Sequence, residues 1–259
     1  MKDLKKDRIE KGQLKRMVQA VGMVYVFLLL PVCIPFTVQT KEGENRQRIE
    51  KAVRTESKNI ETEDEADTED KRIKPKVALT FDDGPSMEYT PMLLEGLKER
   101  GVKASFFLIG CNIEKEGNKE IVKQMYADGH LIGNHTFHHV ELTSLSREQA
   151  LIELKETSDL IEEITGETVE YVRPPFGSWR EELNEEIEAI PVMWSVDPLD
   201  WTTENVEEIV RKVVTDTEEN DMILLHDCYK SSVEAALQIV DILKERGFEF
   251  VTVDELLLD

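Results

Sequence analysis

The sequence has few cysteines, far fewer basic than acidic residues and no glycine-rich phosphate-binding motif. Its 259 residues hold three cysteines without a C-x-x-C pair, which excludes a thiolate zinc framework and a disulfide-dense scaffold. Neither G-x-G-x-x-G nor G-K-S/T is present, which argues against nucleotide binding. The formal net charge is -22, so the chain lacks the basic face that nucleic acid binding requires. Cys33 lies in an apolar run, and the pairing of Cys111 with Cys228 stays open.

The first 38 residues are typical of a membrane anchor. Residues 1–16, the expected cytoplasmic tail, carry seven Lys or Arg against three acids, and residues 17–38 are twenty-two residues without a formal charge. At about 1.5 Å per residue, a helix of that length crosses the roughly 30 Å core of a bilayer. A cleaved signal peptide is the alternative, but no clear A-x-A site follows. Lipid modification of Cys33 is a further alternative, although Val32 fits a lipobox poorly.

An acidic linker follows at residues 39–72. The stretch from Glu61 to Asp70 holds seven acids in ten residues, and no core can be built from it. We therefore expect a disordered stalk that joins the membrane to one domain at residues 73–259. The basic flank of the anchor predicts that the N-terminus is cytoplasmic, which places this domain outside the cytoplasm of a single-pass membrane protein.

From residue 73 onward, apolar strand-like runs alternate with amphipathic helix-like runs. We expect strands at residues 77–81, 104–109, 131–134, 169–173, 192–196, 222–225 and 248–252. We expect helices at residues 92–100, 119–128, 147–165, 181–189, 206–217 and 232–246. This alternation predicts parallel strands joined by crossover helices, in a barrel or a doubly wound sheet. In either architecture the chemistry belongs at the C-terminal ends of the strands.

Two of these strand ends carry candidate metal ligands. Residues 76–85 read K-V-A-L-T-F-D-D-G-P, and the adjacent carboxylates Asp82 and Asp83 are costly to hold together without a cation. Plain turn chemistry is the alternative for this stretch. After the third strand, H-T-F-H-H places His135 and His139 four residues apart, which on a helical turn puts both imidazoles on one face. Two histidines and one carboxylate leave a coordination position open, as catalytic metal sites do.

The later strand ends supply further candidates. Arg173, in R-P-P-F-G, can pair with a carboxylate and fix its orientation. The fifth strand runs into D-P-L-D-W, with Asp197, Asp200 and Trp201, where the indole is either a sugar-pocket wall or plain core. His226 ends the sixth strand. Structural or surface roles are expected for the two other histidines, His130 and His138.

Five motifs in this domain resemble, in order, those of the polysaccharide deacetylase family, also called the NodB-homology domain or carbohydrate esterase family four. They read T-F-D-D-G, H-T-F-H-H, R-P-P-F-G, D-P-L-D-W and I-L-L-H, and they cover nearly all of residues 73–259. Each motif is short, but five in register are highly specific. The resemblance implies an α/β fold, an irregular (β/α) barrel with about seven parallel strands.

The resemblance also implies a role for each motif residue. Asp82 would be the general base, oriented by Arg173, and His226 would be the general acid, tuned by Asp200. The implied ligands of a divalent metal are Asp83, His135 and His139. Zinc is the expected metal, with cobalt, nickel and manganese as alternatives. The implied substrate contacts are the backbone N–H of Phe176, for the oxyanion, and the side chains of Trp201 and Leu224, for the acetyl group.

The implied activity is hydrolysis of N-acetyl groups on N-acetylglucosamine residues of a cell-wall polysaccharide, with release of acetate. Peptidoglycan suits an anchored extracytoplasmic enzyme, a choice that rests on topology and analogy. Chitin-like oligomers, biofilm glucosamine polymers and O-acetylated xylan are the alternatives. A non-haem iron oxygenase shares the ligand set but leaves Asp82, Arg173 and His226 without a role. Complete motifs disfavour a glycan-binding module without turnover, and no nucleotide cofactor or nucleic acid partner is expected.

Overall fold

The computed structural model describes residues 74–258, so the expected tail, anchor and linker at residues 1–72 lie outside the described part of the chain. Among the described residues, no helix is long and apolar enough to cross a membrane. Seven strands form one sheet: β1 (Lys76–Asp82), β2 (Ser105–Leu108), β3 (Leu131–Asn134), β4 (Tyr171–Val172), β5 (Ile190–Pro191), β6 (Asp221–His226) and β7 (Glu249–Val251).

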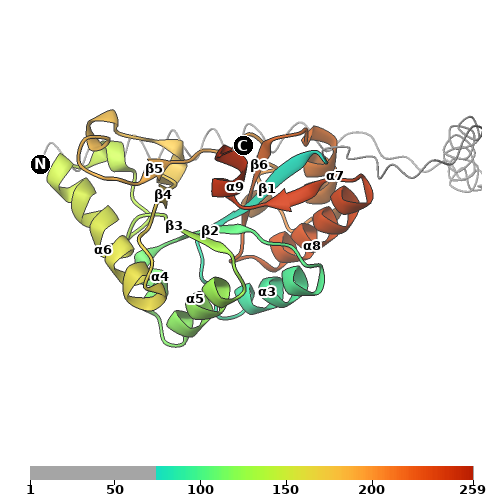
Figure 1. The fold of residues 1–259 in the computed structure, drawn as a ribbon, viewed down its shortest axis with the longest axis horizontal. Helices are drawn as coiled ribbons and strands as arrows, with labels where there is room; N and C mark the ends of the chain where they lie inside the picture. Colours follow the sequence, from blue (N-terminus) through green and yellow to red (C-terminus); the bar gives the residue numbers. More distant parts are fainter. Residues whose placement is uncertain (1–73, 259) are drawn as a thin grey trace, which may run out of the picture. The chain divides into compact units, whose positions relative to one another are not determined.

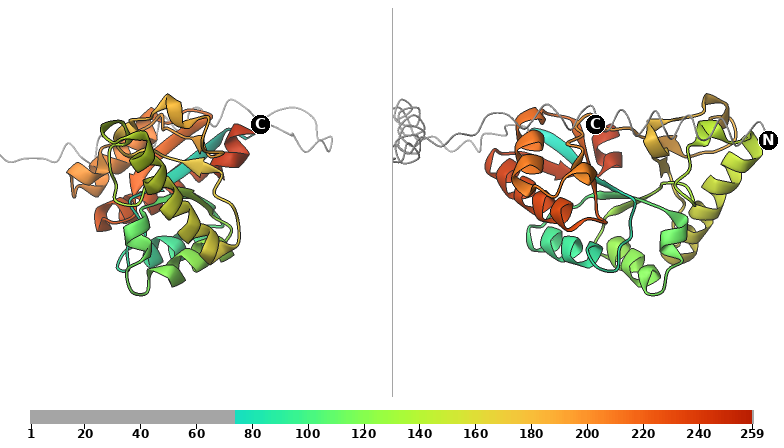
Figure 2. Two further views of the ribbon diagram at one scale, coloured as in Figure 1. Left: turned by 90° about the vertical axis from the view of Figure 1, so that its left-hand side faces the viewer. Right: turned by 180° about the vertical axis from the view of Figure 1, so that it is seen from behind.

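Every strand pairing in the sheet is parallel, in the order β5-β4-β3-β2-β1-β6, and β7 pairs with the start of β1. The sheet curls on itself into a half-barrel (Figures 1 and 2). One bridge between Val196 and Ile223 joins the segment after β5 to β6. The prediction of a curled α/β fold with parallel strands is therefore confirmed.

Helices follow the strands, and all but the last of them cover the outer face of the sheet. They are α3 (Thr90–Glu99), α4 (Gly110–Ile113), α5 (Asn118–Ala127), α6 (Arg147–Thr165), α7 (Val206–Asp216), α8 (Lys230–Glu245) and α9 (Val253–Leu257). Around the sheet, the longer helices pack as neighbours in the order α7, α8, α3, α5 and α6 (Figure 1). Four short 3-10 turns lie at Leu142–Ser144, Pro175–Gly177, Glu181–Leu183 and Asp200–Thr202.

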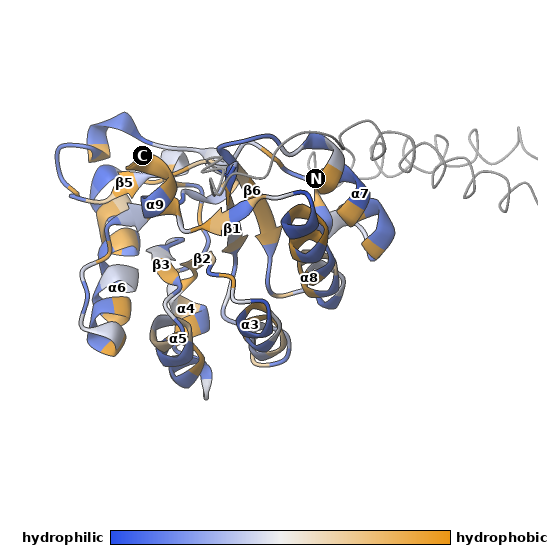
Figure 3. Cartoon of the chain, turned by 45° about the vertical axis from the view of Figure 1, so that its right-hand side comes forward, coloured by the Kyte–Doolittle hydropathy of each residue, from blue (hydrophilic) through white to orange (hydrophobic). Residues whose placement is uncertain are grey.

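The two faces of β1 bury different kinds of side chain. Along β1, Val77, Leu79 and Phe81 belong to the large apolar cluster formed with the helices, which Figure 3 shows as hydrophobic strands and inward helix faces. Because side chains alternate along a strand, Ala78, Thr80 and Asp82 point to the inside of the curl. Two strands away, β3 has Gly133 on the same side, where a Cβ would lie 2.6 Å from the Phe107 ring on β2. The inside of the curl therefore holds the polar groups of the site.

Two predicted elements are wrong. The helix expected at residues 181–189 is only the 3-10 turn Glu181–Leu183 followed by further turns. Glutamates four residues apart, such as Glu181 with Glu185 and Glu182 with Glu186, repel one another on a helix, so the pattern of apolar residues does not suffice. The strand expected at residues 192–196 pairs earlier, at Ile190–Pro191, and keeps only the single bridge at Val196.

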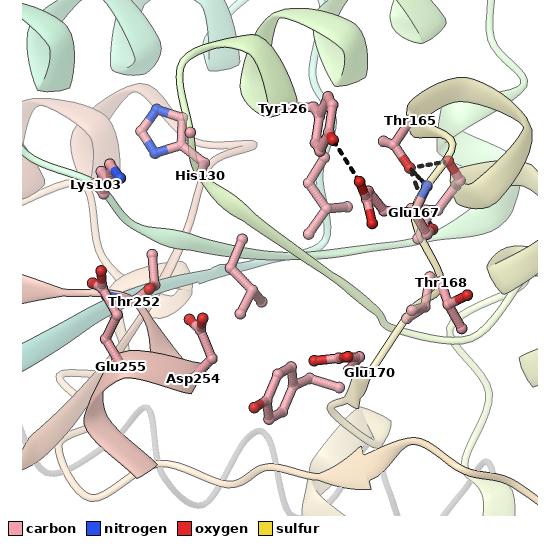
Figure 4. A pocket seen from close by; sticks show the side chains of 16 residues that line it. Lys103, Tyr126, His130, Thr165, Glu167, Thr168, Glu170, Thr252, Asp254 and Glu255 are labelled. Atoms are coloured by element: carbon pink, nitrogen blue, oxygen red, sulfur yellow. Dashed lines mark hydrogen bonds between the residues drawn. The ribbon is translucent and has the colours of Figure 1, made fainter. Parts of the chain in front are cut away.

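His130 has the structural role that was expected for it. It borders a cavity of about 350 Å³ at the amino ends of β3 and β4, opposite the Tyr126–Glu167 hydrogen bond of 3.0 Å (Figure 4). Its Nδ1 accepts from the Ala104 N–H at 3.0 Å, so the proton lies on Nε2, which has no hydrogen-bond partner. Burial of this ring is the main cause that lowers the pKa of His130 to about 4.

We expect His130 to make folding stability depend on pH. Because its pKa falls from about 6.5 in the unfolded chain to about 4 in the fold, its stabilising effect is complete above pH 6.5. About 3 kcal/mol should then be lost as the pH falls to 4. His130→Asn keeps an acceptor for Ala104 but cannot titrate. Urea unfolding from pH 7 to 4 should show the wild type losing stability relative to this variant, and a constant difference would refute the assignment.

Candidate active site

A cleft of about 450 Å³ opens at the carboxyl ends of β1, β3, β4 and β6. Its lining residues are Asp82, Asp83, His135, His139, Pro174, Phe176, Trp194, Asp197, Leu199, Trp201, Leu224, His226 and Tyr229. Of the site residues predicted from sequence, only Arg173 and Asp200 are absent from this lining, and both are buried beside it. The parallel sheet thus brings the five motifs to one place, as their positions at strand ends predicted.

Asp83, His135 and His139 form one cluster of potential metal ligands. Asp83 Oδ1 lies 3.4 Å from His135 Nε2 and 3.3 Å from His139 Nε2. One ligand atom from each residue lies within 4.8 Å of the others, which is close enough for a shared ion. Within the described chain, this is the one group of three or more His, Cys, Asp or Glu residues that meets this condition.

The hydrogen bonds of the cluster fit a divalent metal. Asp83 Oδ1 is buried without a hydrogen-bond partner, so an acceptor is free in the cluster. His135 donates from Nδ1 to the Arg173 carbonyl oxygen at 2.7 Å, which leaves the lone pair of Nε2 facing Asp83. Burial would raise the pKa of Asp83, but the nearby His135, His139 and His226 outweigh it and hold the pKa below its usual value. An ionised carboxylate and two imidazoles are ligands that suit zinc.

The two histidines do not converge through a helix. Residues 135–140 are irregular, and both Thr136 and His139 have positive φ, at 64° and 54°. The predicted convergence of the imidazoles is confirmed, whereas the helical turn proposed as its cause is wrong. The loop turns sharply after β3. A spacing of four residues brings the two imidazoles together across this turn, as it would on a helical turn.

Asp82 is held by Arg173 in the interior of the curled sheet. Arg173 has no exposed surface, and its Nη1 donates to Asp82 Oδ1 at 2.8 Å and to Thr80 Oγ1 at 2.7 Å. The remaining donors reach the carbonyl oxygens of Val192, at 3.3 Å, and Met193, at 3.1 Å. Burial lowers the pKa of Arg173, while Asp82 opposes that change. The pairing of arginine with the first aspartate, expected from sequence, is present.

His226 and Asp200 form a second buried pair at the cleft. Asp200 accepts from His226 Nδ1 at 2.8 Å and from the His226 backbone N–H at 2.9 Å. His226 Nε2 therefore faces the cleft, 4.0 Å from Asp83 Oδ2. Burial lowers the pKa of His226, but Asp200, Asp82 and Asp83 together outweigh it and raise the pKa to about 9. The imidazole is consequently protonated at neutral pH and can donate a proton.

Asp227 supports the loop that carries Asp83. It is fully buried, and its Oδ2 accepts from Thr90 Oγ1 at 2.5 Å, while Thr90 accepts from the Ser86 N–H at 2.7 Å. A Cβ on Gly84 would lie 2.6 Å from this carboxylate, so only glycine fits beside it. Burial is the largest cause that raises the pKa of Asp227 to about 7.

Exposed apolar side chains form the rim of the cleft. Trp201 is 55% exposed, so it is a wall of the cleft rather than core, and Phe176 is 67% exposed with its ring 4.9 Å from His139. Leu224 is buried at the cleft floor. Sequence reasoning missed Trp194, Leu199 and Tyr229, which carry no signal beyond being close to the motifs. It also missed Thr80, although its place two residues before Asp82 puts both side chains on one strand face.

Comparison with known proteins identifies the family of this chain. The polysaccharide deacetylase family profile matches residues 69–193. A peptidoglycan N-acetylglucosamine deacetylase of Bacillus cereus is 36% identical over 70% of this chain and 87% of its own length. This chain belongs to the polysaccharide deacetylase family. The family assignment inferred from the five motifs is therefore confirmed.

Two further comparisons concern one family member, PdaC of Bacillus subtilis, a peptidoglycan N-acetylmuramic acid deacetylase. It is 37% identical over 70% of this chain, and the chain spans 38% of the full length of PdaC. The solved structure of PdaC superimposes with a TM-score of 0.69 at 36% identity, covering 71% of this chain and 90% of that structure. The matched regions of the two proteins therefore share the same fold.

We expect the functions of the two adjacent aspartates, Asp82 and Asp83, to be separable by mutation. Asp83→Ala removes a ligand atom of the cluster, so it should lose both bound metal and activity. Asp82→Asn keeps an oxygen that can accept from Arg173, so it should keep most metal while losing about 100-fold or more in turnover. Elemental analysis and activity of both purified variants test this division. Equal metal loss in both variants would contradict it.

Proposed function

We propose that this chain is a metal-dependent enzyme that removes N-acetyl groups from N-acetylglucosamine residues of a cell-wall polysaccharide, with peptidoglycan as the first candidate. One observation carries the proposal: two groups that can transfer protons lie beside the cluster of potential metal ligands. They are Asp82, which Arg173 holds, and His226, which Asp200 holds. Asp82 Oδ2 lies 3.8 Å from His135 Nε2, and His226 Nε2 lies 4.0 Å from Asp83 Oδ2. Amide hydrolysis needs both a base for water and an acid for the leaving nitrogen.

The buried pairs give the two groups opposite tasks. Arg173 holds Asp82 by a charged hydrogen bond, so its other oxygen can accept the proton of the attacking water. When bound by Asp83, His135 and His139, a divalent metal supplies a Lewis acid that acidifies water and polarises the acetyl carbonyl. The Phe176 N–H donates to the developing oxyanion. His226, oriented and kept protonated by Asp200, then donates its Nε2 proton to the departing sugar nitrogen.

The lining of the cleft supports a neutral acetylated sugar. Leu224 and Trp201 offer apolar contact to the acetyl methyl group, and exposed rings such as Phe176 suit the C–H faces of sugars. Among the described residues that line the cleft there is no Lys or Arg, while Asp197 adds a carboxylate at the edge. Apart from His226, whose proton the leaving nitrogen needs, the described lining offers a free lactyl carboxylate no lysine or arginine, which favours N-acetylglucosamine over N-acetylmuramic acid despite the name of PdaC.

The ligand set favours zinc, with cobalt, nickel and manganese as alternatives. Two imidazole nitrogens and one carboxylate are common in catalytic zinc sites, whereas magnesium and calcium prefer oxygen ligands alone. The apolar run at residues 17–38 and its basic flank support a membrane anchor, with residues 73–259 on the extracytoplasmic side. Cell-wall glycan is the acetylated polysaccharide that such a position would bring within reach.

Acetate release tests the proposed activity directly. Purified protein with added zinc should release acetate from N-acetylglucosamine oligomers and from peptidoglycan, faster than from acetylated xylan. A fragment beginning at Lys71 should stay soluble without detergent and keep this activity if the anchor and linker serve only to locate the domain. The Asp82→Asn variant is the matched control.

Two results would contradict the proposal. The first is no acetate from any N-acetylated polymer while the protein is folded and metal-loaded. The second is faster release from xylan than from glucosamine polymers, which would make the chain an O-acetyl esterase. Separate muropeptide substrates, one acetylated only on glucosamine and one only on muramic acid, decide between the two peptidoglycan sugars.

The role of His226 should depend on the leaving group. A sugar amine leaves a tetrahedral intermediate only when protonated, whereas an activated phenolate leaves with little help. His226→Ala should therefore cost about 10²- to 10⁴-fold in kcat/KM on N-acetylglucosamine oligomers and much less on an activated aryl acetate. Both values are measured at matched metal content. Equal losses on the two substrates would assign His226 a structural role instead.

A further inference from the structure

The loop between His135 and His139 has a backbone conformation that depends on contacts with neighbouring segments. It runs from His135 to His139 outside any helix or strand, and two of its non-glycine residues, Thr136 and His139, are left-handed. Such conformations are uncommon for residues with a Cβ and persist where the surroundings hold them. The direction of each imidazole therefore depends on what binds this loop.

Three neighbouring segments bind the loop. On one side, the first amides of α4 donate to its carbonyl groups: Gly110 to Thr136 at 3.0 Å and Cys111 to Phe137 at 2.9 Å. At its start, Asn134 Oδ1 accepts from the Thr136 N–H at 2.7 Å. The amide nitrogen of Asn134 in turn donates to the Leu154 carbonyl oxygen on α6 at 2.6 Å. The amides of Phe137 and His138 face α6 directly.

A single side chain on α6 accepts from those amides. Glu153 Oε2 accepts from the Phe137 N–H at 3.0 Å and from the His138 N–H at 2.8 Å. Its other oxygen accepts from His138 Nδ1 at 2.8 Å. The Glu153 side chain is only 15% exposed, whereas that of His138 is 58% exposed. Because an ion pair at an exposed histidine contributes little, the two amide contacts are the part of this arrangement that fixes the loop.

We propose that Glu153 is a positioning residue for the metal site: its carboxylate fixes the loop backbone between His135 and His139 and thereby sets the aim of both imidazoles. Partners of this kind, one contact removed from the metal, commonly change metal affinity by about 10- to 100-fold. The inference rests on the proposed metal dependence, but metal binding tests it independently of deacetylation.

Two variants separate position from charge. Glu153→Asp keeps the charge but withdraws the carboxylate by one methylene, about 1.5 Å, from the amides. Glu153→Gln loses the charge but keeps an oxygen at the same reach. A positioning role predicts that Glu153→Asp loses about 10- to 100-fold in zinc affinity and that Glu153→Gln stays near the wild type. His138→Ala, which removes the exposed pairing and the edge contact of this ring with Phe137, should also stay near the wild type, as should Glu156→Ala at an exposed position of the same helix.

The measurement is made on the full-length protein in detergent. Zinc affinity is obtained by competition with a chromogenic chelator, and the visible spectrum of the cobalt-substituted protein reports ligand geometry. The spectrum should change in Glu153→Asp and not in Glu153→Gln, while circular dichroism of the metal-free proteins checks that all are folded. Wild-type affinity and spectrum in Glu153→Asp would overturn the proposal, as would equal losses in Glu153→Gln. A wild type that binds zinc but releases no acetate would refute the proposed function and leave this inference intact.

Discussion

A guanidinium group without exposed surface must satisfy its charge inside the protein, and Arg173 does so within the curled sheet. It joins Asp82 on β1 to the chain that follows β5, and it lies 4.2 Å above the Phe107 ring on β2. Removing either partner of such a pair leaves a buried charge without compensation, at a cost of about 3–5 kcal/mol. The same contact therefore holds strands together and keeps a carboxylate ready beside the cluster of potential metal ligands.

The arrangement of the site follows from how a parallel sheet divides its two faces. Outward-facing side chains of the strands build the apolar core with the helices, so stability is concentrated there. The inner face holds a smaller apolar cluster that includes Ala78 and Phe107, and the polar groups of the site gather at its carboxyl edge. At that edge, Arg173 is held by Asp82 and His226 is held by Asp200, and both are cations. Asp83, a member of the cluster of potential metal ligands, lies close to His226. One small cleft can thus hold the protonated imidazole of His226 and the carboxylate of Asp82 on separate hydrogen-bond partners.

Sequence reasoning predicted what depends on strand ends and missed what depends on packing between distant elements. The places of Asp82, Arg173 and His226 follow from alternation and parallel direction, which short motifs encode locally. Glu153 lies in the middle of a correctly predicted helix, where a glutamate is ordinary, and its partners are set by how α6 lies against β3. The 181–189 segment has helical periodicity, but the repulsion among its glutamates outweighed that pattern.

The loops of this site include most of the left-handed non-glycine residues in the described chain: Asp83, Thr136, His139, Phe176 and Leu199. Each such residue typically lowers folding stability by about 1 kcal/mol or more. The packing of the outer helices has to offset the cost of these loop conformations. If the protein evolved toward higher thermal stability, we would therefore expect substitutions to accumulate in α3, α5 and α8 more often than in these loops. A variant whose loops lost these left-handed conformations would gain thermal stability but lose turnover. A search for stabilised variants is therefore better directed at the outer helices.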